Sequence, residues 1–197
     1  LATLRHGVKC YGRPLHVAFF KAAHELNPEL AARYAANRLG ITRQLHFSPR
    51  SEKSLDVTLS LNGIPVATVE LKNPLTGQTV EDARRQYKQD RDPREPLFEF
   101  KRRTLVHFAV DTEAVLMTTR LAGSATHFLP LNKGCDGGAG NPPDPKGRTY
   151  RTAYLWEEVL QRDRLLDLLA RFIHLQIDEK RDDQGRKVKR ETMIFPR

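Results

Sequence analysis

Apolar and polar residues alternate along the run DVTLSLNGIPVATVELK, which spans residues 56–72. This period of two predicts two β-strands, and the Asn62-Gly63 pair between them is typical of a tight hairpin turn. The same pattern predicts shorter strands at 41–47, 103–110, 114–119 and 127–131.

Helical spacing of apolar residues covers three other segments of the chain. The expected helices are a pair within 15–37 that is broken near 27–28, one at 79–90, and a helical region at 153–176. Thr79 is the expected N-cap of the helix at 79–90, and Trp156 is expected in the core with the leucines that follow it. The pattern as a whole predicts a β-sheet with flanking helices.

The length and composition favour one principal domain. The chain has 197 residues, 39% of them hydrophobic, which is enough for one substantial core. We expect this domain at 1–177, with its core at about 15–130, a Gly- and Pro-rich irregular loop at 130–148 and C-terminal helices at 151–177. The charged segment 178–197 is expected to be a connector.

The net charge of the chain indicates which kind of molecule it binds. Lys and Arg number 33 against 24 Asp and Glu, a formal net charge of +9 that favours a polyanion such as nucleic acid. No apolar run approaches about 18 residues and no signal-peptide pattern is present, so we expect a soluble, cytoplasmic protein with no membrane partner. Cys10 and Cys135 stand far apart without metal-ligand spacing, which supports neither a disulfide nor a zinc site.

The relative position of Asp56 and Glu70 depends on how the two hairpin strands pair. A plain two-residue turn would place Asp56 opposite Val69, with the two carboxylates on opposite faces of the sheet. A one-residue bulge or a three-residue loop would place Asp56 opposite Glu70 instead. Pro65 has no backbone N–H to donate, so we predict an irregularity within 61–66 and both carboxylates on one face.

In that register the two carboxylates lie about 5 Å apart at their Cβ atoms, where their charges repel unless a cation lies between them. Oxygen ligands of this kind suit Mg²⁺, which keeps several waters and also binds substrate phosphates. Lys72, two residues beyond Glu70, shares its face and adds a positive charge for the transition state. Asp56, Glu70 and Lys72 are therefore the candidate catalytic residues of a metal-dependent phosphodiester hydrolase.

Several long motifs together resemble one protein family. In chain order they are NGIPVATVELKNPLTGQTVEDARRQYKQDRDPREPLFEF, LVHFAVDTEAVLMTTRLAG, FLPLNKG, GAGNP and YLWEEVL. Over about residues 27–175 the chain resembles the N-terminal nuclease region of the R subunits of type I restriction enzymes. The resemblance implies a PD-(D/E)xK nuclease of the α/β class, with a mixed central sheet flanked by helices.

The same resemblance implies ligands and partners. Asp56 and Glu70 would bind Mg²⁺, with Mn²⁺ as a substitute, and the backbone carbonyl of Leu71 would complete the protein ligands. The substrate would be double-stranded DNA, cut after ATP-driven translocation by a motor domain to which 178–197 leads. Modification and specificity subunits would assemble with the full-length protein. ATP is not expected to bind to this chain, because it contains no GxxxxGK[ST] loop.

The helix at 79–90 carries the candidate DNA contacts. Many nucleases of this group place a Tyr four residues after a Gln, whereas here Tyr87 directly follows Gln86 and the fourth position is Asp90. The Gln carries over and the Tyr does not. Two interpretations stay open for the polar residues of this region, contact with the DNA backbone or exposure to solvent. These residues are Arg84, Arg85, Gln86, Tyr87, Lys88 and Arg91.

Other polar residues also keep two interpretations. Glu25 and Glu29 either reach the metal or lie in solvent, and Arg43 with Gln44 form either a buried hydrogen-bonding pair or part of the DNA path. The scattered histidines are interpreted as structural because they lack metal-ligand spacing. They are His24, His46, His107 and His127.

A second function from another class is a non-catalytic DNA-binding or docking module that keeps a nuclease-like sheet. Such a module would retain basic surfaces without a working metal site. The intact set of Asp56, Glu70 and Lys72 favours the enzyme instead.

Overall fold

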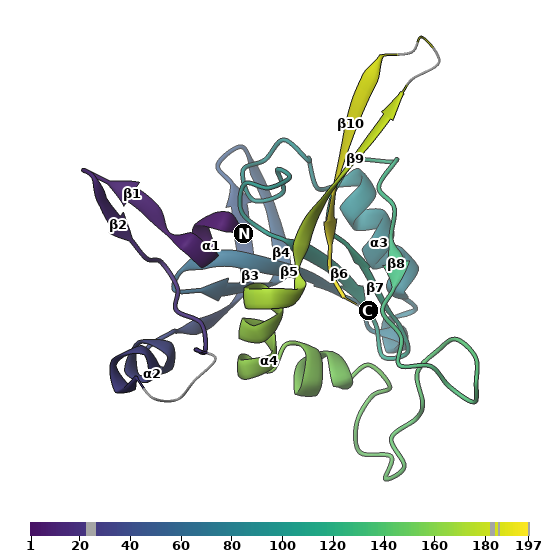
Figure 1. The fold of residues 1–197 in the computed structure, drawn as a ribbon. Coiled ribbons are helices and arrows are strands. Elements are labelled where there is room, and N and C mark those ends of the chain that lie inside the picture. Colours follow the sequence, from purple (N-terminus) through teal and green to yellow (C-terminus); the bar gives the residue numbers. More distant parts are fainter. Residues whose placement is uncertain (23–26, 182–183, 185, 197) are drawn as a thin grey trace.

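A six-stranded mixed β-sheet forms the centre of the structure (Figure 1). The computed structural model describes residues 1–22, 27–181, 184 and 186–196. The strands lie side by side in chain order: β3 (Leu39–Ser48), β4 (Ser51–Leu61), β5 (Ile64–Leu71), β6 (Val106–Val110), β7 (Val115–Thr118) and β8 (Leu129–Pro130). Strands β5 and β6 run parallel and the other neighbours antiparallel, which confirms the predicted mixed α/β sheet.

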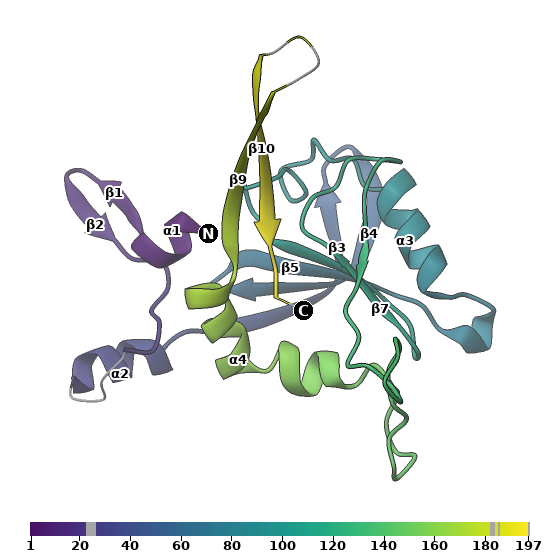
Figure 2. The same cartoon turned by 45° about the vertical axis from the view of Figure 1, so that its right-hand side comes forward.

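The sheet is covered by helices and flanked by two hairpins (Figures 1 and 2). The helical elements are α1 (Ala2–His6), α2 (Pro28–Ala35), η1 (Pro74–Thr76), α3 (Val80–Gln89), η2 (Leu155–Val159), α4 (Arg162–Asp167) and η3 (Leu168–Phe172). The hairpins are β1 (Val8–Cys10) with β2 (Arg13–Leu15), and β9 (His174–Arg181) with β10 (Lys187–Ile194). After β8, the predicted loop through residue 148 is irregular apart from one isolated bridge.

Two apolar layers form because side chains alternate between the faces of each strand. Along β6, Phe108 and Val110 belong to the cluster that contains Leu165 of the C-terminal helices. Ala109, between them, belongs to a second cluster with Tyr87 of α3. The face covered by α3 is the one that carries the candidate site.

The β4–β5 turn has two residues, as the Asn-Gly signal predicts. Asn62 and Gly63 have φ values of 51° and 83°, which match the left-handed conformations that this tight turn requires. Leu61 pairs with Ile64 across it, so the alternative of a three-residue loop is wrong.

One extra residue in β5, Val66, then shifts the register. The pairs on its two sides are Ser60 with Pro65 and Leu59 with Ala67, and the new register continues to Val57 with Val69. Without the bulge the pairs would keep the register set by the turn, and Asp56 would lie opposite Val69. With the bulge, Val57 pairs with Val69, so the next residue pair along the two strands is Asp56 with Glu70. Both side chains then lie on one face of the sheet. The predicted bulge beside Pro65 is confirmed.

Helix α3 begins and ends close to the predicted limits. Thr79 is the N-cap, and its backbone N–H donates a 2.8 Å hydrogen bond to Asp82 in the first turn. Ala83 and Tyr87, one turn apart, are buried against the sheet. The charged residues of the helix therefore occupy its outer surface.

The N-terminal region differs from the two helices predicted within 15–37. Residues 16–22 are not helical, and residues 23–26 lie outside the described residues. The Phe19 N–H donates to the Asn37 side chain, which donates in turn to the Phe19 carbonyl. These bonds tie residue 19 to the segment that follows α2, and only the second helix, α2, is found as predicted.

The C-terminal helical region is divided into three parts. The Leu160 N–H donates a 2.8 Å hydrogen bond to the Leu155 carbonyl five residues earlier, so η2 is π-helical, and η3 is π-helical too. Trp156 is 40% exposed, which contradicts its predicted place in the core. The wider turn explains the error, because it departs from the 3.6-residue repeat on which the prediction rests.

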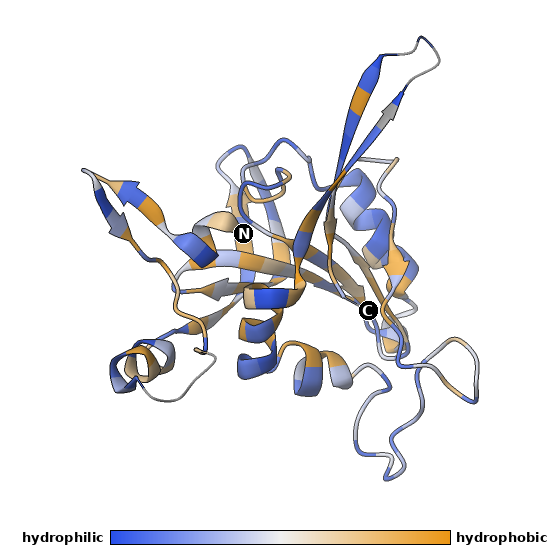
Figure 3. Cartoon of the chain, in the orientation of Figure 1, coloured by the Kyte–Doolittle hydropathy of each residue, from blue (hydrophilic) through white to orange (hydrophobic). Residues whose placement is uncertain are grey.

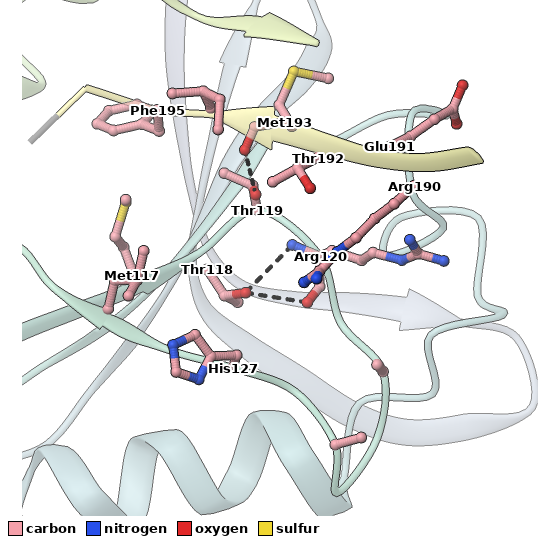
Figure 4. Close-up of a pocket in the computed structure, with 14 residues that line it drawn as sticks. Met117, Thr118, Thr119, Arg120, His127, Arg190, Glu191, Thr192, Met193 and Phe195 are labelled. Carbon is pink, nitrogen blue, oxygen red and sulfur yellow. Dashed lines mark hydrogen bonds between the residues drawn. The ribbon is translucent and has the colours of Figure 1, made fainter. Parts of the chain in front are cut away.

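Strands β9 and β10 pair antiparallel in the region where the sequence predicts a charged connector from residue 178 onward. Away from the sheet, the described residues of β9 and β10 are mostly hydrophilic (Figure 3). Met193 and Phe195, by contrast, are buried in the core. The Thr119 hydroxyl donates a 2.7 Å hydrogen bond to the Met193 carbonyl (Figure 4). The two apolar residues, spaced as on a strand, anchor a segment that is otherwise charged.

A cavity of about 430 Å³ lies where β10 crosses the end of β7 (Figure 4). Its lining includes Met117, His127 and Arg190. None of the predicted catalytic residues lines it, so the candidate site lies elsewhere on the sheet.

We predict that Phe195→Ala lowers the free energy of unfolding by about 3–5 kcal/mol. The change removes a buried ring that packs edge-on against Phe108, at 5.8 Å between centroids, and leaves a cavity. Val188→Ala, on the exposed part of the hairpin, is the control and should change stability by less than about 0.5 kcal/mol. Urea denaturation measures both. Equally small effects would mean that the hairpin adds nothing to the core.

Candidate active site

Asp56 lies just beyond the last paired residues of β4 and β5, and both of its carboxylate oxygens are hydrogen-bonded. Oδ2 accepts a 2.8 Å hydrogen bond from the backbone N–H of Leu71. Oδ1 accepts a 3.2 Å bond from the side-chain amide of Gln44. Asp56 thus bridges the end of β5 and the edge strand β3.

Gln44 is one of the residues for which the sequence allows two interpretations, a hydrogen-bonding partner or part of the DNA path. It has a φ of 50°, and its side-chain oxygen accepts a 2.8 Å hydrogen bond from the Ser54 hydroxyl. The side chain therefore belongs to the hydrogen-bond network of Asp56. No local pattern in the sequence signals a left-handed residue within a strand, so this contact could not be found without the fold.

Glu70 is fully buried, with 0% of its surface exposed. Arg91 Nε donates a 2.8 Å hydrogen bond to its Oε1, and Arg91 Nη2 lies 2.6 Å from the same oxygen in an ion pair. Its other oxygen, Oε2, is buried and has no hydrogen-bond partner among the described residues. Burial raises the pKa of Glu70 to about 8, and the nearby Asp56 charge raises this pKa further while Arg91 opposes the shift.

Two of the predicted DNA contacts are wrong. Arg91 is only 2% exposed. It donates hydrogen bonds to Glu70 and, at 2.7 Å, to the Ser54 carbonyl. Its guanidinium lies 5.2 Å from the centre of the Phe47 ring. Tyr87 is fully buried. Both side chains point into the layer between α3 and the sheet, so neither lies on the outer surface of the helix.

A buried polar chain lies beneath the carboxylates. The Tyr87 hydroxyl is 2.8 Å from Thr68 Oγ1, which is 2.7 Å from Nδ1 of His107. Burial lowers the pKa of His107 to about 3, so its ring is neutral. The prediction that His107 is a structural histidine is confirmed.

Lys72 follows the last residue of β5, and its backbone N–H donates a 2.8 Å hydrogen bond to Val110. Alternation places its side chain on the face of Glu70. Its ammonium forms no ion pair within the described part of the chain. Lys72 also helps to lower the pKa of Asp82, after the larger effects of the Thr79 backbone N–H and Arg85.

The outer surface of α3 carries the remaining predicted DNA contacts. Arg84 forms an ion pair with Glu81, and Arg85 forms one with Asp82 at 2.8 Å. Lys88 has no ion-pair partner among the described residues. These basic residues line one shallow groove of about 280 Å³ together with Ser124, and Gln86 is half-buried beside it.

The two glutamates considered as extra metal ligands receive no support. Glu29 is exposed on α2, where it forms an ion pair with Arg33. Glu25 lies outside the described residues, as does His24.

The donor set near Asp56 and Glu70 fits a hard divalent cation. Two carboxylates and the backbone carbonyl of Leu71 at the end of β5 would provide oxygen ligands, the kind that Mg²⁺ prefers. The unpartnered, buried Oε2 of Glu70 is an acceptor that the fold itself leaves unsatisfied. Across residues 1–22, 27–181, 184 and 186–196, no group of three or more His, Cys, Asp and Glu side chains is arranged to hold a metal ion.

The mixed sheet with flanking helices and the paired carboxylates on its α3 face define a domain of the α/β nuclease-like class. The chain matches the family described as type I restriction enzyme R protein N terminus over residues 21–126, which is more than half of its length. It belongs to that family.

Comparison with curated proteins and with solved structures gives no significant match. The family and the fold therefore rest on the family match and on the geometry. In the described part of the chain, no helix has the length and apolar character needed to cross a bilayer.

We predict that Glu70 makes the metal-free protein less stable as the pH rises. Its pKa is about 8 in the fold against an ordinary 4.5, so between these values the folded protein holds a proton that the unfolded chain has released. This stabilisation is complete below pH 4.5 and is lost by pH 8, at up to about 1.4 kcal/mol per pH unit. Urea denaturation in EDTA should show a flatter profile for Glu70→Gln. Parallel profiles for both proteins would contradict the assignment.

Proposed function

We propose that this domain is the Mg²⁺-dependent endonuclease of its restriction enzyme and hydrolyses phosphodiester bonds of double-stranded DNA. The observation that carries the proposal is the register of β4 and β5, which places Asp56 opposite Glu70 with Lys72 two residues beyond. Membership of the R protein N-terminal family supports the same activity. A module that only binds DNA would need none of these three residues.

Asp56, Glu70 and the Leu71 carbonyl are the groups that would hold Mg²⁺, or Mn²⁺ in its place. When bound, the ion would offset charge on the reacting phosphate and favour the deprotonated form of water. Asp56 is held for this role by Leu71 and Gln44, so little reorientation is needed. Glu70 contributes an oxygen that accepts no other bond.

Lys72 would act on the phosphate itself. Its ammonium forms no ion pair with any described residue, and it lies on the face that carries the carboxylates. An unpaired cation in this position can stabilise the negative charge that develops on the phosphate oxygens in the transition state. Its charge is also available to orient the attacking water.

The outer face of α3 would hold the DNA backbone close to the carboxylates. Lys88 is free to pair with a phosphate, while Arg84 and Arg85 must first exchange their own carboxylate partners. Gln86 can add a neutral hydrogen bond. Such contacts fix the position of the duplex without reading its sequence, so we expect sequence-independent binding.

The R protein as a whole would supply what this chain lacks. We place ATP use and translocation in a motor outside these residues, and assembly with modification and specificity subunits in the complete protein. Cutting would then follow translocation, which brings DNA to this domain at high local concentration.

We predict that Asp56→Asn, Glu70→Gln and Lys72→Met each slow DNA cleavage by at least about 100-fold in the complete R protein assembled with its partner subunits. Lys146→Met, in the exposed irregular loop, is the matched control and should cut normally. Linearisation of a plasmid in Mg²⁺ measures the rate. Normal cleavage by the Lys72→Met enzyme would remove this residue from the mechanism, and normal cleavage by all three variants would support the non-catalytic alternative.

We predict that Lys88→Ala weakens DNA binding to the same extent on unrelated duplexes. It should also reduce the slope of log K against log salt by about 0.9, the value for one lost phosphate contact. Arg84→Ala should have a smaller effect, because Arg84 is already paired with Glu81. Fluorescence anisotropy over a range of salt concentrations gives both slopes. An effect confined to one duplex sequence would show that this surface reads bases.

A further inference from the structure

The Arg91–Glu70 contact is asymmetric in a way that bears on the proposed metal site. Arginine and carboxylate groups often pair through two parallel hydrogen bonds, with one nitrogen on each oxygen. Here Nε and Nη2 both approach Oε1, at 2.8 and 2.6 Å. Oε2 stays buried without a partner. One oxygen of Glu70 is thus engaged twice and the other is left open.

The guanidinium of Arg91 is itself fixed from several sides. Nη2 also donates to the Ser54 carbonyl of β4 at 2.7 Å, and the Phe47 ring of β3 lies 5.2 Å away. The residue follows Asp90, the C-cap of α3. Three elements therefore determine where the planar donor group lies, and Glu70 has to orient to meet it.

We infer that Arg91 is a positioning residue for Glu70, holding Oε1 so that Oε2 is the oxygen offered to a divalent cation. The inference rests on the proposed function, because it takes Glu70 as a ligand of that cation. This role differs from the DNA contact that the sequence suggests for Arg91. Partners that orient metal ligands in this way commonly change metal affinity by about 10–100-fold when they are removed.

Charge alone would have the opposite effect. A fixed arginine close to a divalent cation repels it, so a purely electrostatic role predicts tighter metal binding once the arginine charge is removed. Positioning predicts weaker binding, because Glu70 loses the contact that fixes its orientation. The Arg91→Lys variant separates the charge effect from the positioning effect further, because lysine keeps the positive charge but lacks the planar pair of donors.

The test is calorimetric titration of the 197-residue chain with Mn²⁺, without DNA, for wild type, Arg91→Lys and Arg91→Met. We expect both variants to bind Mn²⁺ about 10-fold or more weakly than wild type. Arg94→Lys and Arg94→Met are the matched controls, because Arg94 is exposed and pairs with Asp92 rather than with Asp56 or Glu70. The Mn²⁺ affinity of these two control variants should equal that of wild type.

The outcomes separate this inference from the proposed function. Wild-type affinity in Arg91→Lys, or tighter binding by Arg91→Met, would overturn the positioning role and leave the metal site intact. Failure of wild type to bind Mn²⁺ would overturn the proposed metal site and the positioning role with it.

A second measurement covers the possibility that Arg91→Met does not fold. Urea denaturation in EDTA of Arg91→Met, Glu70→Gln and the double variant forms a cycle that needs no metal. If Arg91 acts through Glu70, the double variant should be less destabilised than the sum of the single variants. Additive losses would show that Arg91 acts elsewhere and would overturn the inference.

Discussion

A one-residue bulge at Val66 is the constraint on which the candidate site depends. Because side chains alternate along a strand, one residue more or less decides whether two acidic residues on neighbouring strands share a face. The bulge brings Asp56 and Glu70 together on the face that α3 covers. The same shift places the charge of Lys72 on that side, so one local irregularity determines the chemistry of a whole sheet face.

The charges of α3 are divided between its inner and outer sides. Tyr87 faces the sheet, and Arg91, just past the helix end, turns inward to meet Glu70. A buried pair of this kind is costly to form and costlier to break, because removing one member leaves the other charge without a partner. The outward residues Arg84 and Arg85 form exposed ion pairs, which cost little to form or to exchange. The inner side of α3 thus packs against the carboxylates, while its outer side is the surface proposed to bind DNA.

The sequence was most informative where the signal is local. Strand alternation, the Asn-Gly turn, the cap at Thr79 and the missing N–H of Pro65 anticipated the hairpin, its bulge and α3. The errors concern features that depend on distant contacts. Burial of Arg91 requires β3, β4 and α3 to be assembled first, and Gln44 meets Asp56 only because of a left-handed residue that no pattern announces. The sequence did not predict the β9–β10 hairpin because the segment is mostly charged, and only Met193 and Phe195 near its end pack into the core.

The hairpin at the end of the described chain bears on how the domain folds during synthesis. A single apolar cluster joins residues from Leu4 to Phe195, so its contacts span nearly the whole sequence. Such non-local contacts form late and slowly. A chain emerging from the ribosome can complete this cluster only after Phe195 has emerged. Until then Phe108 lacks the ring that packs edge-on against it in the finished fold.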